Sequence, residues 1–186
     1  SRGLGDVYKR QAAAANESTL LYLVTGYPFA INKEKDTAKA VLCSTHLGPC
    51  LGHVAAATVF GENNPAGRTP TTWYRSVRDL PALDDYDIAK NHVTYLYFRG
   101  KPLYAFGYGL SYTTFEYSNL TLDKSEMKDT DTLTVSVNVR NTGKVKGKEV
   151  VQLYVAKPES RTIRPIKELR GFEKVELEPG EEKTVT

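Results

Sequence analysis

The sequence predicts two unlike parts, an α/β part followed by an antiparallel β-sandwich. Three observations predict this order. Short apolar runs and one stretch with helical spacing fill the first 60 residues, and a long segment rich in Gly, Pro and aromatic residues follows. From Phe115 onward, apolar residues recur at every second position, which is the period of a half-buried strand.

In the first part, two short apolar runs are predicted to be buried strands. Leu20–Val24 ends in a Thr-Gly-Tyr-Pro turn, and Ala38–Cys43 is the second run. Leu51–Phe60 has helical spacing, and Gly61 stands where a C-terminal helix cap belongs. Two strands followed by a helix are typical of the end of a parallel sheet.

The segment 61–114 is too irregular for a helix or a run of strands. Up to residue 112 it holds five glycines, four prolines and ten aromatic residues. Gly and Pro set bends, and large rings need a scaffold to cover them, so we expect a long loop pinned by its rings. A loop of this length is normally functional or anchored.

The last part reads as an antiparallel sandwich. Leu133–Val139 alternates apolar with polar residues, and Val151–Val155 does so again. Asn141–Gly143 and Glu178–Glu181 are predicted turns, and Lys183–Thr186 begins another strand. Short alternating strands separated by turns are typical of a β-sandwich.

Composition excludes several classes of protein. The chain of 186 residues is 40% hydrophobic and 25% charged, as in ordinary globular proteins. A net charge of +3 gives no reason to expect a nucleic acid or an anionic membrane as partner. No apolar run approaches the length of a membrane span, and two cysteines do not make a disulfide framework.

Residues 1–11, SRGLGDVYKRQ, do not fit the pattern that follows. They have neither the layout of a signal peptide nor a strand pattern. We interpret them as a foreign leader, with a natural loop as the alternative.

Five stretches carry a family resemblance. They are FGENNPAGRTPTTWYRS (60–76), DLPALDDYD (79–87), GKPLYAFGYGLSYTTFEYS (100–118), NTGKVKGKEVVQLYV (141–155) and IKELRGFEKVELEPGE (166–181). Over residues 17–186 the chain resembles the C-terminal part of family 3 glycoside hydrolases, especially their β-xylosidase branch. The resemblance implies an α/β fragment, the end of an α/β sandwich domain, followed by an incomplete antiparallel β-sandwich of the fibronectin type III-like kind.

The resemblance also implies domain boundaries. Residues 12–99 would be the C-terminal part of the α/β domain, 100–118 a linker, and 119–186 a truncated fibronectin type III-like domain. Because both units would then be incomplete, we expect marginal stability.

The implied activity is that of a β-xylosidase, which releases terminal β-linked xylose from xylo-oligosaccharides by a retaining mechanism. In such enzymes the nucleophile lies on a barrel domain, and the acid/base usually lies in the α/β domain upstream of residue 17. We therefore expect no catalytic residue, no metal ligand and no cofactor in these 186 residues, and no activity of the fragment alone. Substrate-binding residues and oligomeric state stay unassigned.

Several alternatives stay open. The parent enzyme could be an arabinofuranosidase or a glucosidase, because sugar choice would depend mainly on the barrel, through which an oligosaccharide substrate would bind. A non-catalytic carbohydrate-binding or scaffold module is the other functional class. Two N-x-S/T sequons, at Asn16 and Asn119, permit glycosylation, and we expect an extracellular protein or one of the secretory pathway.

Four residues have the side chains of zinc ligands, namely Cys43, His46, Cys50 and His53. All four fall within eleven residues, which is cramped for one site. In relatives this loop reads Y-P-G-Q-x-G-G, so the departure puts any family role of the loop in doubt. The alternatives are unligated Cys and His side chains, or a disulfide.

The carboxylates of the long segment could suggest a glycosidase pair. They are Glu62, Asp79, Asp84, Asp85 and Asp87. Their turn-like setting favours solvated loop residues. Arg68 in NPAGRTP could bind a ligand, but its planar fork more simply anchors neighbouring carbonyls or a carboxylate.

Six rings of the segment could form a platform for sugar stacking, or a seam between domains. They are Tyr95, Tyr97, Phe98, Tyr104, Phe106 and Tyr108. Relatives often carry Arg at the position of Leu96 and Pro at that of Ala105, so an ion pair and a preset φ are lost here. His92 is interpreted as a solvated loop histidine.

Overall fold

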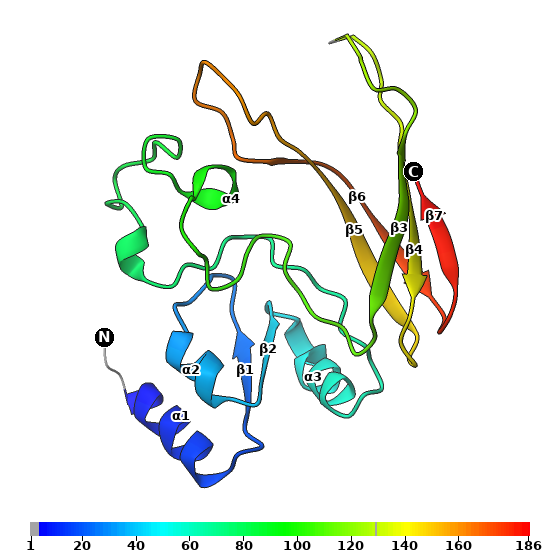
Figure 1. Ribbon diagram of the computed structural model, residues 1–186. Helices are drawn as coiled ribbons and strands as arrows, with labels where there is room; N and C mark the ends of the chain where they lie inside the picture. Colours follow the sequence, from blue (N-terminus) through cyan, green and yellow to red (C-terminus); the bar gives the residue numbers. More distant parts are fainter. Residues whose placement is uncertain (1–3, 129) are drawn as a thin grey trace. The chain divides into compact units, whose positions relative to one another are not determined.

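The computed structural model describes residues 4–128 and 130–186, and the chain divides into two compact units (Figure 1). The α/β unit comprises Ser1–Val54, Thr69–Phe106 and Lys157–Ile166, and the sandwich unit comprises Ala55–Arg68, Gly107–Ala156 and Lys167–Thr186. Each unit is therefore assembled from three separate stretches of chain.

The α/β unit contains a two-stranded parallel sheet. Strand β1 pairs with β2 so that Leu20 lies opposite Ala40 and Val24 opposite Ser44. Both predicted strands are confirmed, although β2 begins two residues later than predicted. The elements are α1 (Leu4–Ala15), β1 (Leu20–Val24), α2 (Asn32–Thr37), β2 (Ala40–Ser44), the 3-10 turns Gly48–Cys50 and Val77–Asp79, and α4 (Thr94–Tyr97).

Two helices bear on earlier predictions. Helix α3 (Leu51–Val59) confirms the helix predicted before Gly61, whose φ of +83° suits a C-terminal cap. Helix α1 crosses the predicted leader boundary at Gln11, so residues 4–11 are helical rather than the loop named as the alternative. Four alanines at 12–15 favour that helix. Residues 1–3 of the predicted leader lie outside the described residues.

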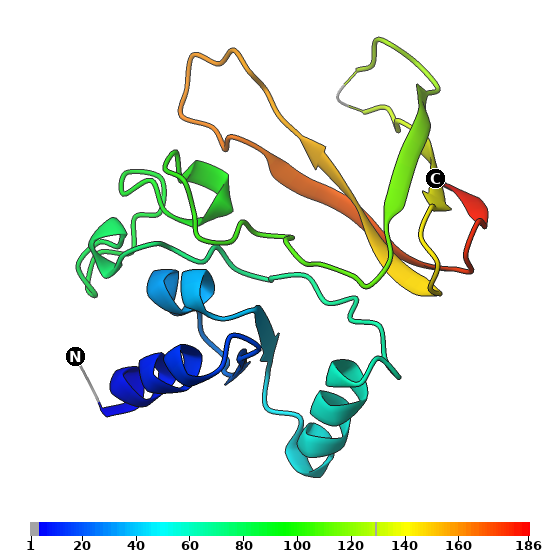
Figure 2. The ribbon, with the colours of Figure 1, turned by 60° about the horizontal axis from the view of Figure 1, so that its bottom comes forward.

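The long segment has little regular structure, as predicted, and Figures 1 and 2 show it as winding coil. In the α/β unit, an isolated antiparallel bridge joins Trp73 to Tyr104. Trp73 N–H donates to the Tyr104 carbonyl over 2.9 Å, and Leu103 N–H donates to the Trp73 carbonyl over 2.7 Å. The core of this unit is Ile31, Trp73 and Leu103, none of which lies in a strand.

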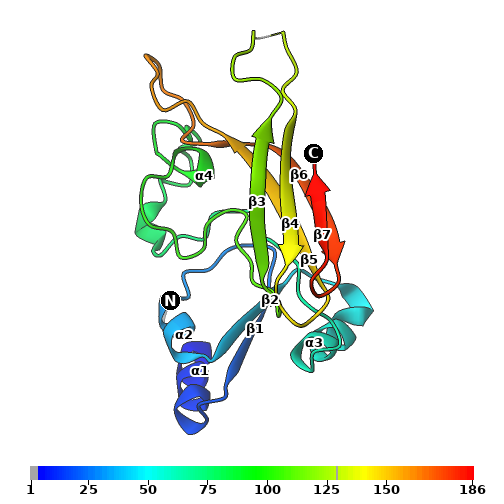
Figure 3. The same cartoon turned by 45° about the vertical axis from the view of Figure 1, so that its right-hand side comes forward.

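The sandwich unit consists of two antiparallel sheets (Figure 3), with strand orders β3-β4-β7 and β5-β6. Its core draws on three strands, with Val139 from β4, Val175 and Leu177 from β6, and Val185 from β7. The strands are β3 (Phe115–Leu122), β4 (Val135–Asn141), β5 (Gly147–Val155), β6 (Glu168–Leu177) and β7 (Glu182–Val185). The predicted antiparallel part is confirmed.

Strands β3 and β6 do not show clean alternation. The register of β3 shifts between Ser118 and Thr121, and Asn119 has a φ of +53° there. The pairing of β5 with β6 shifts between Leu153 and Tyr154, opposite Gly171. A bulge adds one residue to one strand and so breaks the two-residue period on which the prediction relied.

The predicted turn at Asn141–Gly143 contains a fully buried side chain, that of Asn141. Its Nδ2 donates to the Val145 and Leu177 carbonyls over 2.9 and 3.0 Å. Its Oδ1 accepts from Thr113 Oγ1 over 2.6 Å and from Gly143 N–H over 3.1 Å. A residue predicted from turn chemistry alone therefore also ties strand β6 to the turn.

Candidate functional site

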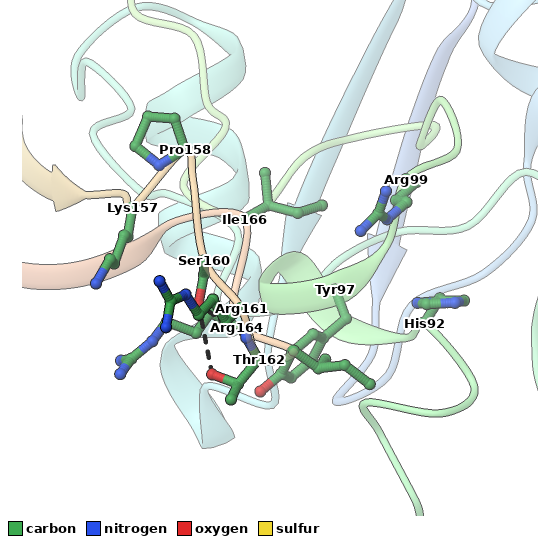
Figure 4. Close-up of a pocket in the computed structure, with 11 residues that line it drawn as sticks. His92, Tyr97, Arg99, Lys157, Pro158, Ser160, Arg161, Thr162, Arg164 and Ile166 are labelled. Carbon is green, nitrogen blue, oxygen red and sulfur yellow. Dashed lines mark hydrogen bonds between the residues drawn. The ribbon is translucent and has the colours of Figure 1, made fainter.

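A cavity of about 370 Å³ lies in the α/β unit, beside helix α4 and the loop 157–166 (Figure 4). The loop is held to the helix by the Ile166 N–H, which donates to the Leu96 carbonyl over 2.6 Å. The two stretches of wall are far apart in the sequence, so the cavity is a product of the fold.

Four permanent cations line this cavity, and no carboxylate does. They are Arg99, Lys157, Arg161 and Arg164, all of them exposed. Among the described residues none of the four has an ion-pair partner, whereas Lys90 and Lys183 each have one and Lys146 has two. The cavity wall is therefore positively charged, and no described carboxylate in the wall neutralises that charge.

Hydroxyl groups and one aromatic ring complete the wall. The Ser160 and Thr162 hydroxyls lie 3.4 Å apart, and the half-buried Tyr97 presents its ring to the cavity (Figure 4). His92, interpreted from sequence as a solvated loop histidine, is exposed, has a φ of +51° and also lines the cavity. Guanidinium, ammonium and hydroxyl donors together suit a polar, anionic ligand.

Most rings of the proposed sugar platform pack against other rings. Tyr95 and Phe106 stack with centroids 4.1 Å apart and planes 13° apart. Phe98 meets Tyr74 edge to face at 4.9 Å, and Tyr104 meets Trp73 in the same way at 5.9 Å. These contacts pin the segment as predicted, and Tyr97 is the ring of the six that lines the cavity.

The four zinc-type side chains do not form a metal site in the described part of the chain. Cys43 lies on β2, Cys50 in a 3-10 turn and His53 on α3, while His46 lies in the intervening loop. All four are exposed, and both cysteines are free thiols.

Three of the five carboxylates serve turns and caps. Asp79 Oδ2 accepts from Ser76 N–H over 3.1 Å, which completes a capping box. Asp85 accepts from Asp87 N–H, and this bond lowers the pKa of Asp85. Asp87 in turn accepts from Lys90 N–H over 3.0 Å. Asp84 and Glu62 are exposed. A lowered pKa favours a structural carboxylate over a catalytic acid, which needs a raised one.

Arg68 is an anchor in the sandwich unit. Its Nη2 lies 2.7 Å from Glu149 Oε2, and both side chains are largely buried. Glu149 Oε1 also accepts from the Tyr117 hydroxyl over 3.0 Å. Burial, and then the Glu149 carboxylate, raise the pKa of Tyr117. The arrangement supports the anchoring interpretation of Arg68, with Glu149 as its carboxylate partner.

Comparison with known families places the chain. Residues 6–112 match the glycosyl hydrolase family 3 C-terminal domain, and residues 149–186 match the fibronectin type III-like domain. The chain belongs to glycosyl hydrolase family 3. The resemblance found in the sequence, and the fold class that it implied, are thereby confirmed.

Family 3 relatives include enzymes with two sugar preferences in their names. A periplasmic β-glucosidase of Salmonella typhimurium is 40% identical, over 93% of this chain and 24% of the relative. A β-xylosidase of Formosa agariphila is 38% identical, over 90% of this chain and 24% of the relative. The chain therefore spans about a quarter of the length of these curated relatives.

Solved structures also resemble this chain. A β-glucosidase from Kluyveromyces marxianus, in complex with glucose, superposes with a TM-score of 0.86 at 34% identity, over 98% of this chain and 23% of that one. The similarity covers nearly all of this chain.

Stretches that carry the family resemblance contact one another within the sandwich unit. In FGYG, Gly107 has a φ of +79°, and an added Cβ would lie 2.1 Å from Gln152 Oε1. Asn64 of NNPAGR accepts from Ser111 Oγ and Tyr112 N–H and donates to the Lys146 carbonyl. The Asn64 amide thus links three of the stretches that carry the family resemblance.

Sequence reasoning missed the cationic wall. The signal that could have found it is the run KPESRTIR, which places three cations within eight residues at 157–164. Its meeting with Arg99 depends on the fold.

Proposed function

We propose that the chain is the C-terminal part of a retaining β-xylosidase, which removes terminal β-linked xylose from xylo-oligosaccharides. The main support is that the chain belongs to family 3. It spans about a quarter of the length of its curated relatives. The carboxylates would then come from parts of the protein outside these 186 residues.

A retaining mechanism needs two carboxyl groups about 5–5.5 Å apart, one as nucleophile and one as acid and then base. Asp79, Asp85 and Asp87 are already engaged in backbone caps and turns. The chain would therefore contribute structural support to the enzyme and no catalytic group.

Two observations support xylose as the sugar. They are the similarity to a β-xylosidase and the stretch 60–76, which resembles the β-xylosidase branch. The β-glucosidase relative favours glucose as the alternative. The two sugars differ by one hydroxymethyl group. A pocket that excludes or accommodates such a group changes kcat/KM by about 10- to 200-fold.

Aryl glycosides test this proposal. The longer protein should hydrolyse an aryl β-xyloside with a kcat/KM at least about tenfold above that for the aryl β-glucoside. The 186-residue chain should release no aryl alcohol from either substrate. A reversed ratio would assign the protein to β-glucosidases, and turnover by the chain alone would place catalytic carboxylates within it.

A non-catalytic carbohydrate-binding module is the second candidate, and the cavity beside Tyr97 favours it. Retention of the chain on insoluble xylan, with no turnover by the longer protein, would put this function first.

We also propose an extracellular or secretory location. Its support is the name of the periplasmic relative and two exposed sequon asparagines, Asn16 and Asn119. Detection of the protein in the culture medium or periplasm of its source would test the location.

A further inference from the structure

We propose that the cationic cavity binds an acidic oligosaccharide, a xylan-type chain that carries uronic acid carboxylates. The proposal rests on the proposed function, because that function brings the protein to xylan. It names a ligand class and a binding site for it.

The charge distribution is the first argument. The chain has 25 Lys and Arg against 22 Asp and Glu. Four of the 25 Lys and Arg side chains line one cavity that no described carboxylate lines, although Glu159 lies in the same loop. Like charges held together repel one another, and a bound anion would remove that cost.

The arrangement of the wall is the second argument. In Figure 4, Lys157 and Arg99 lie at opposite ends of the cavity, with Tyr97 and the segment from Ser160 to Thr162 between them. A ligand that uses both ends must be extended and bear more than a single compact charge. The hydroxyls between the ends match the hydroxyls of sugar rings.

The chemistry of the donors is the third argument. An arginine fork binds a carboxylate through two parallel hydrogen bonds, and three of the four cations are arginines. The Tyr97 ring offers an apolar face to a sugar ring. A volume of about 370 Å³ lies within the usual range of ligand sites, roughly 300–1,000 Å³.

Calorimetric titration tests the site. The probes are xylotriose bearing one glucuronic acid, neutral xylotriose, sodium phosphate and a single-stranded oligonucleotide. We expect binding of the acidic sugar, weakened by added salt, and binding of neutral xylotriose weaker by at least about tenfold. Arg99→Ala and Arg161→Ala should each weaken binding of the acidic sugar by about tenfold or more, since each removes a charge-assisted hydrogen bond.

Arg78→Ala is the matched control, because Arg78 is an exposed arginine of the same unit that does not line the cavity. It should leave binding unchanged. Arg161→Lys, which keeps the charge, should retain more affinity than Arg161→Ala. The fluorescence of Trp73, the single tryptophan, verifies that each variant is folded.

Three outcomes would overturn the proposal. They are equal binding of acidic and neutral sugars, tighter binding of phosphate or of the oligonucleotide than of the acidic sugar, and equal loss of affinity in Arg78→Ala. The titration involves no turnover. Loss of aryl xyloside hydrolysis would therefore count against the proposed function and leave the binding result standing.

Discussion

The two units build their cores in different ways. In the sandwich unit, the buried residues Val139, Val175, Leu177 and Val185 all lie in strands, and Val139 and Leu177 have no exposed surface. In the α/β unit, the buried residues Ile31, Trp73 and Leu103 all lie outside strands. Strand residues Leu21, Leu23 and Val41 are only partly buried there.

The difference shows where stability resides. The sandwich buries side chains through regular alternation across two sheets, whereas the α/β unit depends on an irregular segment held by the Trp73–Tyr104 bridge. We therefore expect core substitutions to cost more in the sandwich unit.

The largest effect is expected for Leu177→Ala. Removing a fully buried leucine side chain from the sandwich core should lower the free energy of unfolding by about 4 kcal/mol. Urea unfolding followed by far-UV circular dichroism measures it. Leu153→Ala, at a leucine that is 37% exposed, is the control and should cost about 1 kcal/mol. Equal losses would contradict the assignment of Leu177 to a closed core.

A smaller effect is expected for Leu103→Ala in the α/β unit. The loss should be about 2 kcal/mol, because the surrounding coil can relax into part of the space. Trp73 packs in the same cluster and is the single tryptophan, so its fluorescence reports this unit. Leu83→Ala, at a leucine that is 96% exposed, should leave the transition unchanged. A loss at Leu103 as large as that at Leu177 would remove the contrast between the units.

The smallest effect concerns pH and the charged surface of the sandwich. Hydrogen bonds from Lys146 and then Lys148 lower the pKa of Glu176 from its ordinary value of 4.5 to about 2. The folded state therefore keeps this carboxylate ionised where the unfolded state binds a proton. The resulting stabilisation is present above pH 4.5 and is lost as the pH falls toward 2.

Glu176→Gln should flatten the dependence of stability on pH between 4.5 and 2, as followed by thermal unfolding at a series of pH values. Glu173→Gln on the same strand, at an exposed residue, is the control and should retain the slope. The effect should shrink in high salt because the side chains are exposed. An unchanged slope in Glu176→Gln would show that other carboxylates cause the acid sensitivity.

Periodicity predicted the elements whose backbone is regular. Leu20–Val24 and the helix from Leu51 were predicted within a residue or two, because a local pattern of burial marks them. The bounds of strands β3 and β6 were not predicted, because bulges near Asn119 and Gly171 interrupt the alternation of their side chains. Asp79, Asp85 and Asp87 accept backbone hydrogen bonds in the turns where the sequence places them. Glu149 as the partner of Arg68 could not be predicted across 81 positions.

By itself, the sequence determined the family, the order of an α/β part and an antiparallel part, and the irregularity of the segment between them. These depend on local chemistry, namely the alternation of side chains and the bends set by Gly and Pro. The tertiary structure alone decided which residues meet, including the burial of Trp73 against Leu103 and the gathering of Arg99 with Lys157, Arg161 and Arg164. Such meetings depend on long-range packing and hydrogen bonds, such as the one from Ile166 to Leu96, which no local pattern encodes.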